Sequence, residues 1–188
     1  KFPQLSLAGI EADDIMGSLA TQYAPNFDEI ILMTGDQDSF QLVTDKVKIA
    51  THQKGRSDLF LYTPEDVKNK LGVFPDRVID FKALKGDSSD NIPGVPGIGD
   101  KTAVKLLDSY NSLDGIYESI DNVTSNSVRQ KLRDHKDKAY LSYELATIKC
   151  DVDFKRSVSE LVYEPDWTTI LQLFQDLQFD RLVAKYSK

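Results

Sequence analysis

Residues 81–107 have the sequence FKALKGDSSDNIPGVPGIGDKTAVKLL. Within this stretch, the segment from Gly94 to Ala103 lies between two segments that are expected to be helical. Its glycines allow a tight hairpin and a close approach by another backbone, and the free N–H groups at the following helix start suit a phosphate. An ordinary Gly/Pro loop is the plain alternative. A nucleotide-binding glycine loop fits less well, because no buried strand precedes it and its Lys-Thr pair has no suitable spacing.

The first half of the same stretch carries two acids, Asp87 and Asp90, in the polar turn Asp87-Ser88-Ser89-Asp90-Asn91. Carboxylates three residues apart can face the same way if the turn is helical. Asp, Ser and Asn are also the residues that cap helices and build turns. Taken alone, the turn is therefore more typical of local structure than of a functional site.

Upstream, three carboxylates stand within four residues in Glu11-Ala12-Asp13-Asp14, where a helix is expected to begin. Compensation of the helix dipole would explain one such acid, at about 0.3–1 kcal/mol. Three crowded acids repel one another, so a cation is the natural way to hold them together. Hard divalent ions prefer oxygen ligands of this kind.

Two more acids, Asp36 and Asp38, follow the apolar run Ile30–Met33. The run predicts a strand that is buried on both faces of a parallel sheet, and open parallel sheets bind ligands at the carboxyl ends of their strands. A metal site and ordinary surface acids are equally good interpretations of this pair alone. Residues 1–40 hold seven acids and one base, so the acidity of the chain is concentrated in this region.

The remaining pattern predicts an α/β fold with a largely parallel sheet, followed by a helical part. Further strands are expected at 47–50 and 59–62, joined by a polar loop at 52–56. Thr63-Pro64-Glu65-Asp66 is a strong helix start, and this helix should end at Gly72. The other expected helices cover residues 13–24, 75 to a stop at 86, 100–110, 125–135, 137–148, 166–176 and 178–186.

The composition of the chain is that of an ordinary globular domain: 188 residues, a net charge of −7, 40% hydrophobic and 28% charged residues. The single cysteine, Cys150, excludes an internal disulfide framework and fits a reducing cytoplasmic compartment. No stretch approaches the roughly 18 apolar residues of a membrane span. Because Lys1 is not preceded by an initiator Met and no signal-peptide pattern follows it, we expect the chain to begin inside a longer protein.

The chain resembles the 5′ nuclease (5′-3′ exonuclease) domain of bacterial DNA polymerase I, in the flap endonuclease family. Three ordered strings carry the resemblance: GIEADDIMGSLA at 9–20, ILMTGDQDSFQLV at 31–43 and the stretch at 81–107. The resemblance implies two divalent ions, Mg²⁺ or Mn²⁺, bound by catalytic carboxylates, which here are Glu11, Asp13, Asp14, Asp36, Asp38, Asp87 and Asp90. It also implies a helix-hairpin-helix that grips duplex DNA without reading its sequence, shaped by Gly94, Gly97 and Gly99, with Lys101 and Thr102 nearest the phosphates.

The same resemblance implies hydrolysis of phosphodiesters near a 5′ end or a 5′ flap, by a two-metal mechanism, in DNA replication and repair. Family members begin with a further stretch that supplies the first strand of the sheet, additional aspartates and a basic helical arch. Since this sequence lacks that stretch, we expect a sheet that is incomplete at its N-terminal side and little activity of the 188 residues alone. We expect a partial nuclease core at 1–90 and a helical DNA-binding part at 91–188, packed as one domain.

The expected partner is duplex DNA with a 5′ end or flap, bound by a monomer in the bacterial cytoplasm at the nucleoid, away from any membrane. The resemblance allows a polymerase domain C-terminal to these residues in the same chain, and the sequence leaves open whether one follows. The rival interpretation is a non-catalytic duplex DNA-binding module that keeps the hairpin but has lost turnover; retention of all seven acids argues against it. A metal-dependent ribonuclease with a related acidic core would have no reason to carry a DNA-type hairpin.

Overall fold

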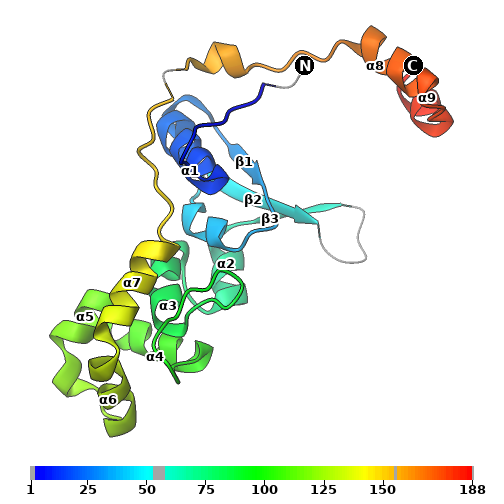
Figure 1. Cartoon of the computed structure of the whole chain (residues 1–188). Helices are drawn as coiled ribbons and strands as arrows, with labels where there is room; N and C mark the ends of the chain where they lie inside the picture. Colours follow the sequence, from blue (N-terminus) through cyan, green and yellow to red (C-terminus); the bar gives the residue numbers. More distant parts are fainter. Residues whose placement is uncertain (1–2, 53–57, 155, 188) are drawn as a thin grey trace. The chain divides into compact units, whose positions relative to one another are not determined.

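The structure is a computed structural model that describes residues 3–52, 58–154 and 156–187 (Figure 1). Three strands form one sheet in the order β1-β2-β3, and their bounds are Ile30–Met33, Val47–His52 and Leu59–Tyr62. β1 and β2 are parallel, with Ile30 opposite Val47. β2 and β3 are antiparallel, with Ile49 opposite Tyr62.

The predicted α/β class and the three predicted strands are confirmed, but only the first strand pair is parallel. The connection from β2 to β3 runs from His52 to Leu59. Such a connection is too short for the crossover of about a dozen residues that a parallel pair needs, so the two strands form a hairpin. Beyond His52, the predicted polar loop lies outside the described residues.

The first strand is not buried on both faces, as its apolar sequence had predicted. Ile31 and Met33 are 49% and 65% exposed, whereas Ile30 and Leu32 on the other face are half-buried. Among the described residues, none covers one face of β1. Half-buried and exposed residues therefore alternate along this strand, although all four of its residues are apolar.

All of the predicted helices are present, with ends that differ from the prediction by at most three residues. The described α-helices, in chain order, are α1 (Ala12–Tyr23), α2 (Pro64–Leu71), α3 (Val78–Lys85), α4 (Asp100–Tyr110), α5 (Leu113–Glu118), α6 (Asn126–Asp134), α7 (Lys136–Ala146), α8 (Trp167–Asp176) and α9 (Asp180–Tyr186). The helix start at Thr63 is a capping box with Asp66, and Gly72 ends α2 in the left-handed conformation, with φ of 85°.

Two helical segments differ from the prediction. The short helix α5 was not predicted, because its six residues are too few to show a periodic pattern; it is capped by the Ser112 side chain. The helix predicted at 137–148 ends at Ala146, and the chain then continues without helix or strand to residue 157 in the described part.

The central element of the fold is α3, in which Val78, Phe81, Ala83 and Leu84 are buried. It packs against both α4 and α7. One hydrophobic core therefore extends from the sheet, through α3, to the helices that follow, and includes residues such as Phe40, Ile49, Leu84, Leu107 and Leu132.

Close contacts divide the chain into two units, Gly9–Val152 and a second unit formed by Lys1–Ala8 with Asp153–Lys188. All candidate site residues belong to the first unit. In the second unit, α8 and α9 are joined by aromatic contacts, including the stacked rings of Trp167 and Tyr186, with centroids 5.4 Å apart. Among the described helices, none has the length and apolar character that crossing a membrane requires.

Candidate metal centre and nucleic-acid interface

The turn after β1 presents two of the acids. The backbone N–H of Asp36 donates to Thr34 Oγ1 over 3.1 Å, and the N–H of Asp38 donates to Asp36 Oδ1 over 2.9 Å. These local bonds are typical of Asp in turns. They lead into a 3₁₀ turn, Asp38–Leu42, in which Ser39 and Phe40 are buried and Asp38 is half-buried.

The second acidic turn follows α3. Asp87 and Ile92 exchange two backbone hydrogen bonds, of 2.9 and 2.8 Å, which close the turn that carries Asp90. Asp87 Oδ1 accepts from the Ser89 N–H over 3.0 Å. The other carboxylate oxygen of Asp87 accepts from Lys82 Nζ over 3.0 Å.

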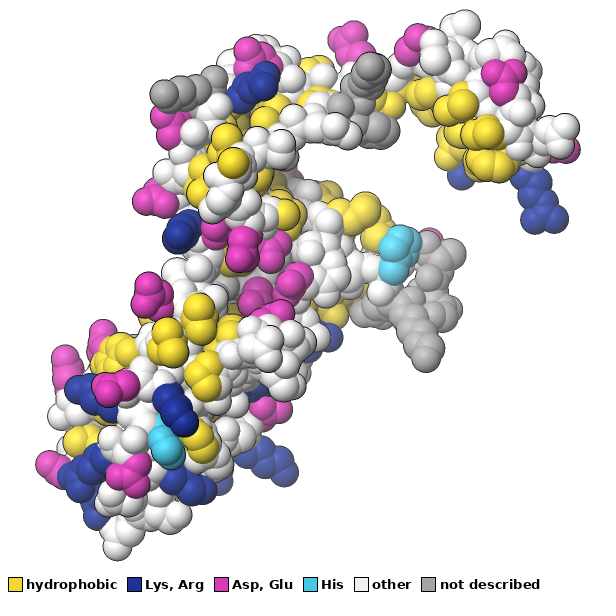
Figure 2. Space-filling view, in the orientation of Figure 1, with side chains coloured by type: hydrophobic (Ala, Val, Ile, Leu, Met, Phe, Trp, Pro, Cys, Tyr) yellow, Lys and Arg dark blue, Asp and Glu magenta, His cyan; other side chains and the backbone are white. Residues whose placement is uncertain are grey.

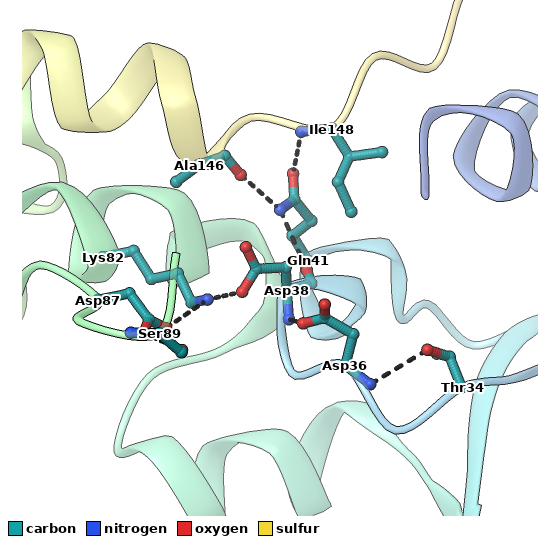
Figure 3. Close-up of polar contacts among 9 residues, drawn as sticks. All are labelled: Thr34, Asp36, Asp38, Gln41, Lys82, Asp87, Ser89, Ala146 and Ile148. Atoms are coloured by element: carbon teal, nitrogen blue, oxygen red, sulfur yellow. Dashed lines mark hydrogen bonds and ion pairs between the residues drawn. The ribbon is translucent and has the colours of Figure 1, made fainter. Parts of the chain in front are cut away.

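Lys82 is a cation buried inside the acidic site. Its residue is only 5% exposed, and its ammonium forms ion pairs with both Asp38 and Asp87 (Figure 3). Burial raises the pKa of Asp87, but the hydrogen bonds from Ser89 and Lys82 outweigh that effect and lower it to about 2. The Asp87 carboxylate is therefore charged at neutral pH, and Lys82 joins the two acidic turns through its ion pairs.

The acidic turns supply a compact set of oxygen ligands. One carboxylate oxygen each of Asp38, Asp87 and Asp90 lies within 4.8 Å of the others. Asp38 Oδ1 is buried and is paired with the Lys82 ammonium. A set of ligands made only of carboxylate oxygens fits a hard divalent cation.

The acids of α1 reach the same place. Burial raises the pKa of Asp13, and the carboxylates of Asp36, Glu11, Asp14 and Asp90 raise it further. Asp90 belongs to both sets and links the acids near α1 to the acidic turns, but among the described residues only Asp38, Asp87 and Asp90 have ligand oxygens within 4.8 Å of one another. Acidic side chains gather on this face of the first unit (Figure 2).

Sequence reasoning missed Lys82. A signal was present, because Val78, Phe81, Lys82 and Lys85 follow the i, i+3, i+4, i+7 spacing of one helix face. The position of Lys82 on a core-facing stripe, five residues before an acidic turn, indicates a buried charge that needs acidic partners.

The glycine hairpin links α3 to α4. A Cβ at Gly94, whose φ is 59°, would lie 2.3 Å from the Gly86 nitrogen, so this glycine permits two backbones to approach closely. The Gly94 N–H donates to the buried Ser142 Oγ over 2.9 Å. The carbonyl of Gly97, whose φ is 81°, accepts from Lys131 Nζ over 3.0 Å.

Only part of the hairpin backbone is free to donate. The N–H groups of Gly94, Ile98 and Thr102 are used within the protein. Those of Gly97 and Gly99 have no hydrogen-bond partner in the described part of the chain. Lys101 is exposed and Thr102 half-buried beside them at the start of α4, and such a helix start suits a phosphate.

The acidic cluster offers oxygen ligands that suit a hard divalent cation, and the free N–H groups of the exposed hairpin suit phosphate oxygens. The family profile described as "5'-3' exonuclease, N-terminal resolvase-like domain" matches residues 1–72, and "5'-3' exonuclease, C-terminal SAM fold" matches residues 73–168. The chain therefore belongs to the 5′-3′ exonuclease family, and the resemblance noted in its sequence is confirmed.

Individual relatives agree with this assignment. The chain is 46% identical to DNA polymerase I of Bacillus subtilis (strain 168) over 186 residues, which make up 98% of this chain and 21% of the relative. It is 40% identical to a 5′-3′ exonuclease of Buchnera aphidicola subsp. Schizaphis graminum over 163 residues, which make up 84% of this chain and 55% of that protein. The chain thus spans about a fifth of the length of its DNA polymerase I relatives.

Solved structures share the fold. The T5 5′-exonuclease with bound divalent metal ions (zinc) superposes with a TM-score of 0.69 at 26% identity, over 79% of this chain and 54% of that one. The catalytic core of Rad2 in complex with a DNA substrate superposes with a TM-score of 0.60 at 18% identity, over 95% of this chain and 63% of that one. The second comparison supports the fold alone.

Replacing Lys82 by Met tests the buried ion pair. The substitution leaves Asp38 and Asp87 without a counter-cation, so we expect the free energy of unfolding in EDTA to fall by about 1–3 kcal/mol. We also expect Mg²⁺ to stabilise the variant more than the wild type, because the metal replaces the missing positive charge. Urea denaturation with EDTA and with Mg²⁺ measures both effects.

The matched control is Lys85→Met, on the same helix. Lys85 pairs with Asp100 over 3.3 Å at the surface, where the side chains are 29% and 70% exposed, so its loss should cost less than about 1 kcal/mol. Equal stability of the Lys82→Met variant and the wild type in EDTA would contradict the role assigned to this ammonium.

Replacing Gly99 by Val tests the hairpin. No heavy atom lies within 4 Å of a Cβ built at Gly99, and its φ is −105°, so the fold tolerates a side chain there. A phosphate on the free N–H groups would meet the new side chain, and we expect duplex DNA affinity to fall about tenfold, as for the loss of one or two hydrogen bonds. Fluorescence anisotropy at two salt concentrations measures the affinity.

The control for this variant is Ser109→Val, at an exposed position near the other end of α4. It should bind duplex DNA like the wild type. Unchanged affinity of the Gly99→Val variant would show that no ligand approaches the hairpin backbone at this point.

Proposed function

We propose that this chain forms the metal-binding and duplex-gripping part of a 5′-3′ exonuclease or flap endonuclease that hydrolyses DNA phosphodiesters by a two-metal mechanism. The observation that carries the proposal is the convergence of Asp38, Asp87 and Asp90, with ligand oxygens within 4.8 Å of one another, at the end of the helix that leads to the hairpin. Their donor set is oxygen only, as Mg²⁺ and Mn²⁺ prefer.

Seven carboxylates would hold the ions: Glu11, Asp13, Asp14, Asp36, Asp38, Asp87 and Asp90. The chemistry that two bound ions supply is activation of a water and stabilisation of negative charge on the attacked phosphate. Burial and the neighbouring carboxylates both raise the pKa of Asp13, and a divalent ion would relieve the repulsion from those neighbours.

The hairpin would hold the duplex while the acids act on one strand. Free N–H groups of Gly97 and Gly99, with Lys101 and Thr102, offer hydrogen bonds and charge to phosphate oxygens and none that depends on base identity. Binding should therefore be independent of sequence and should weaken with salt. Because the chain carries a net charge of −7, bound cations would also reduce its repulsion of DNA near the acids.

Named relatives support these proposals. A bacteriophage T5 flap endonuclease, 25% identical to this chain, was solved in a complex with DNA and metal ions and has the same fold, with a TM-score of 0.69. Since several relatives are named DNA polymerase I, we include in the proposal a polymerase domain C-terminal to this chain. The proposal also keeps the monomeric state and the place in the bacterial cytoplasm that were expected from the sequence. The division into a nuclease core at 1–90 and a DNA-gripping part at 91–188 also belongs to it.

Cleavage of a 5′-flapped duplex tests the proposed activity. The assay compares the 188-residue chain with a version that is extended upstream to the length of its exonuclease relative, each with Mg²⁺ and with EDTA. We expect the extended protein to cleave only with Mg²⁺, and Asp38→Asn to slow it by about a hundredfold or more, because displacement of a reacting group by about 1 Å has effects of this size. The shorter chain should cleave poorly.

Asp108→Asn, at an exposed position of α4 outside the cluster, is the control and should cleave at the wild-type rate. If the extended protein bound duplex DNA without metal-dependent cleavage, the non-catalytic module would be the correct interpretation. Brisk cleavage by the 188-residue chain would show that the seven acids suffice without an upstream segment.

A further inference from the structure

Gln41 connects the Asp38 turn to a distant part of the chain. Its Nε2 donates to the carbonyl oxygens of Asp38, over 3.0 Å, and Ala146, over 2.8 Å (Figure 3). Its Oε1 accepts from the backbone N–H of Ile148 over 2.9 Å. The bonds to the Ala146 carbonyl and the Ile148 N–H are the two that a residue of a neighbouring parallel strand would make with the backbone of residues 146–148. Ala146 and Gln41 are 105 residues apart in the sequence.

The same distant segment, residues 146–152, is attached to α1, and we name it the strap. Asp14 Oδ1 accepts from the Lys149 N–H over 2.8 Å. Ser18 Oγ donates to the Lys149 carbonyl over 3.1 Å and accepts from the Val152 N–H over 3.0 Å. A Cβ at Gly17 would lie 2.8 Å from Ile148 Cγ2, so α1 and the strap are in direct contact.

The strap is itself anchored to the third acidic element. It continues from α7, which packs against α3 and whose buried Ser142 accepts the N–H of Gly94, just beyond the Asp87–Asp90 turn. A continuous stretch, residues 142–152, therefore contacts α1, the Asp38 turn and the hairpin that follows the Asp87–Asp90 turn. Their mutual distances depend on a segment that supplies no carboxylate to the cluster.

We propose that Gln41 is a positioning residue that fixes the position of Asp38 relative to Asp14 through the strap. This relative position sets the affinity of the acidic cluster for a divalent cation. The proposal rests on the proposed function. It is distinct from ligation, because the Gln41 amide is used in bonds to the backbone. Loss of partners that orient metal ligands typically costs about 10- to 100-fold in metal affinity.

A metal-free experiment tests the connection itself. Gln41→Met keeps the length and approximate volume of the side chain but removes its three hydrogen bonds. We expect faster amide hydrogen exchange at Ile148, whose N–H loses its acceptor, and also at Lys149, whose acceptor is Asp14. Unchanged exchange at Lys149 would overturn the proposal, because the two attachments would then be independent.

Titration with Mn²⁺, with free Mn²⁺ measured by electron paramagnetic resonance, tests the consequence. The Gln41→Met chain should bind Mn²⁺ about tenfold more weakly than the wild type. Ser18→Ala loosens the strap from α1 without touching the Asp38 turn, and it should weaken Mn²⁺ binding similarly. This variant replaces Gln41→Met in the test if Gln41→Met does not fold. Tyr117→Phe, which loses a 3.1 Å bond to the Leu132 carbonyl, is the control and should bind like the wild type.

The two measurements separate the possible failures. Equal Mn²⁺ affinity of the wild type and both strap variants would overturn the positioning role. A wild-type chain that binds no Mn²⁺ would overturn the metal centre instead, and amide exchange would still decide whether Gln41 and Asp14 are coupled. Weakened binding in the Tyr117→Phe control would mean that any loss of stability lowers affinity, which would also refute a specific role for Gln41.

Discussion

The crowding of carboxylates on the acidic face of the first unit is the main physical constraint on this structure. The protein offsets part of the resulting repulsion with its own donors: the Lys82 ammonium lies between Asp38 and Asp87, and backbone N–H groups donate to Asp14 and Asp36. At Asp13, burial raises the pKa of the carboxyl, and the neighbouring carboxylates raise it further. A cation is the missing partner that such an arrangement favours.

A single helix places the acidic site and the hairpin at a fixed separation. Lys82 lies on α3, the Asp87–Asp90 turn follows it, and Gly94 closes back onto Gly86 at the helix end. Since α3 is buried between α4 and α7, a duplex held by the hairpin would have little freedom relative to the acids. The proposed function would use this rigidity, because phosphate contacts position a duplex while the acidic site would supply the chemistry.

The sequence predicted the local features of this protein well and its long-range ones poorly. Helix caps, the strand at 30–33 and the three acidic groups follow from short patterns, because turns, caps and periodicity are local. Three features depend on which segments lie together in the folded protein: the open face of β1, the burial of Lys82 and the hydrogen bond between Gln41 and Ala146. A single sequence shows no local pattern from which such pairings can be predicted. Hairpin glycines were identified as a group, but only the structure separates Gly94, which serves packing, from Gly99, whose surroundings are open.

Anomalous diffraction from crystals of the chain grown with Mn²⁺ tests the central claim most directly. The account predicts the strongest anomalous peak between the carboxylates of Asp38, Asp87 and Asp90, within bonding distance of their oxygens, with the Lys82 ammonium moved away from Asp38. A strongest peak outside this cluster, with Lys82 still bridging Asp38 and Asp87, would contradict it.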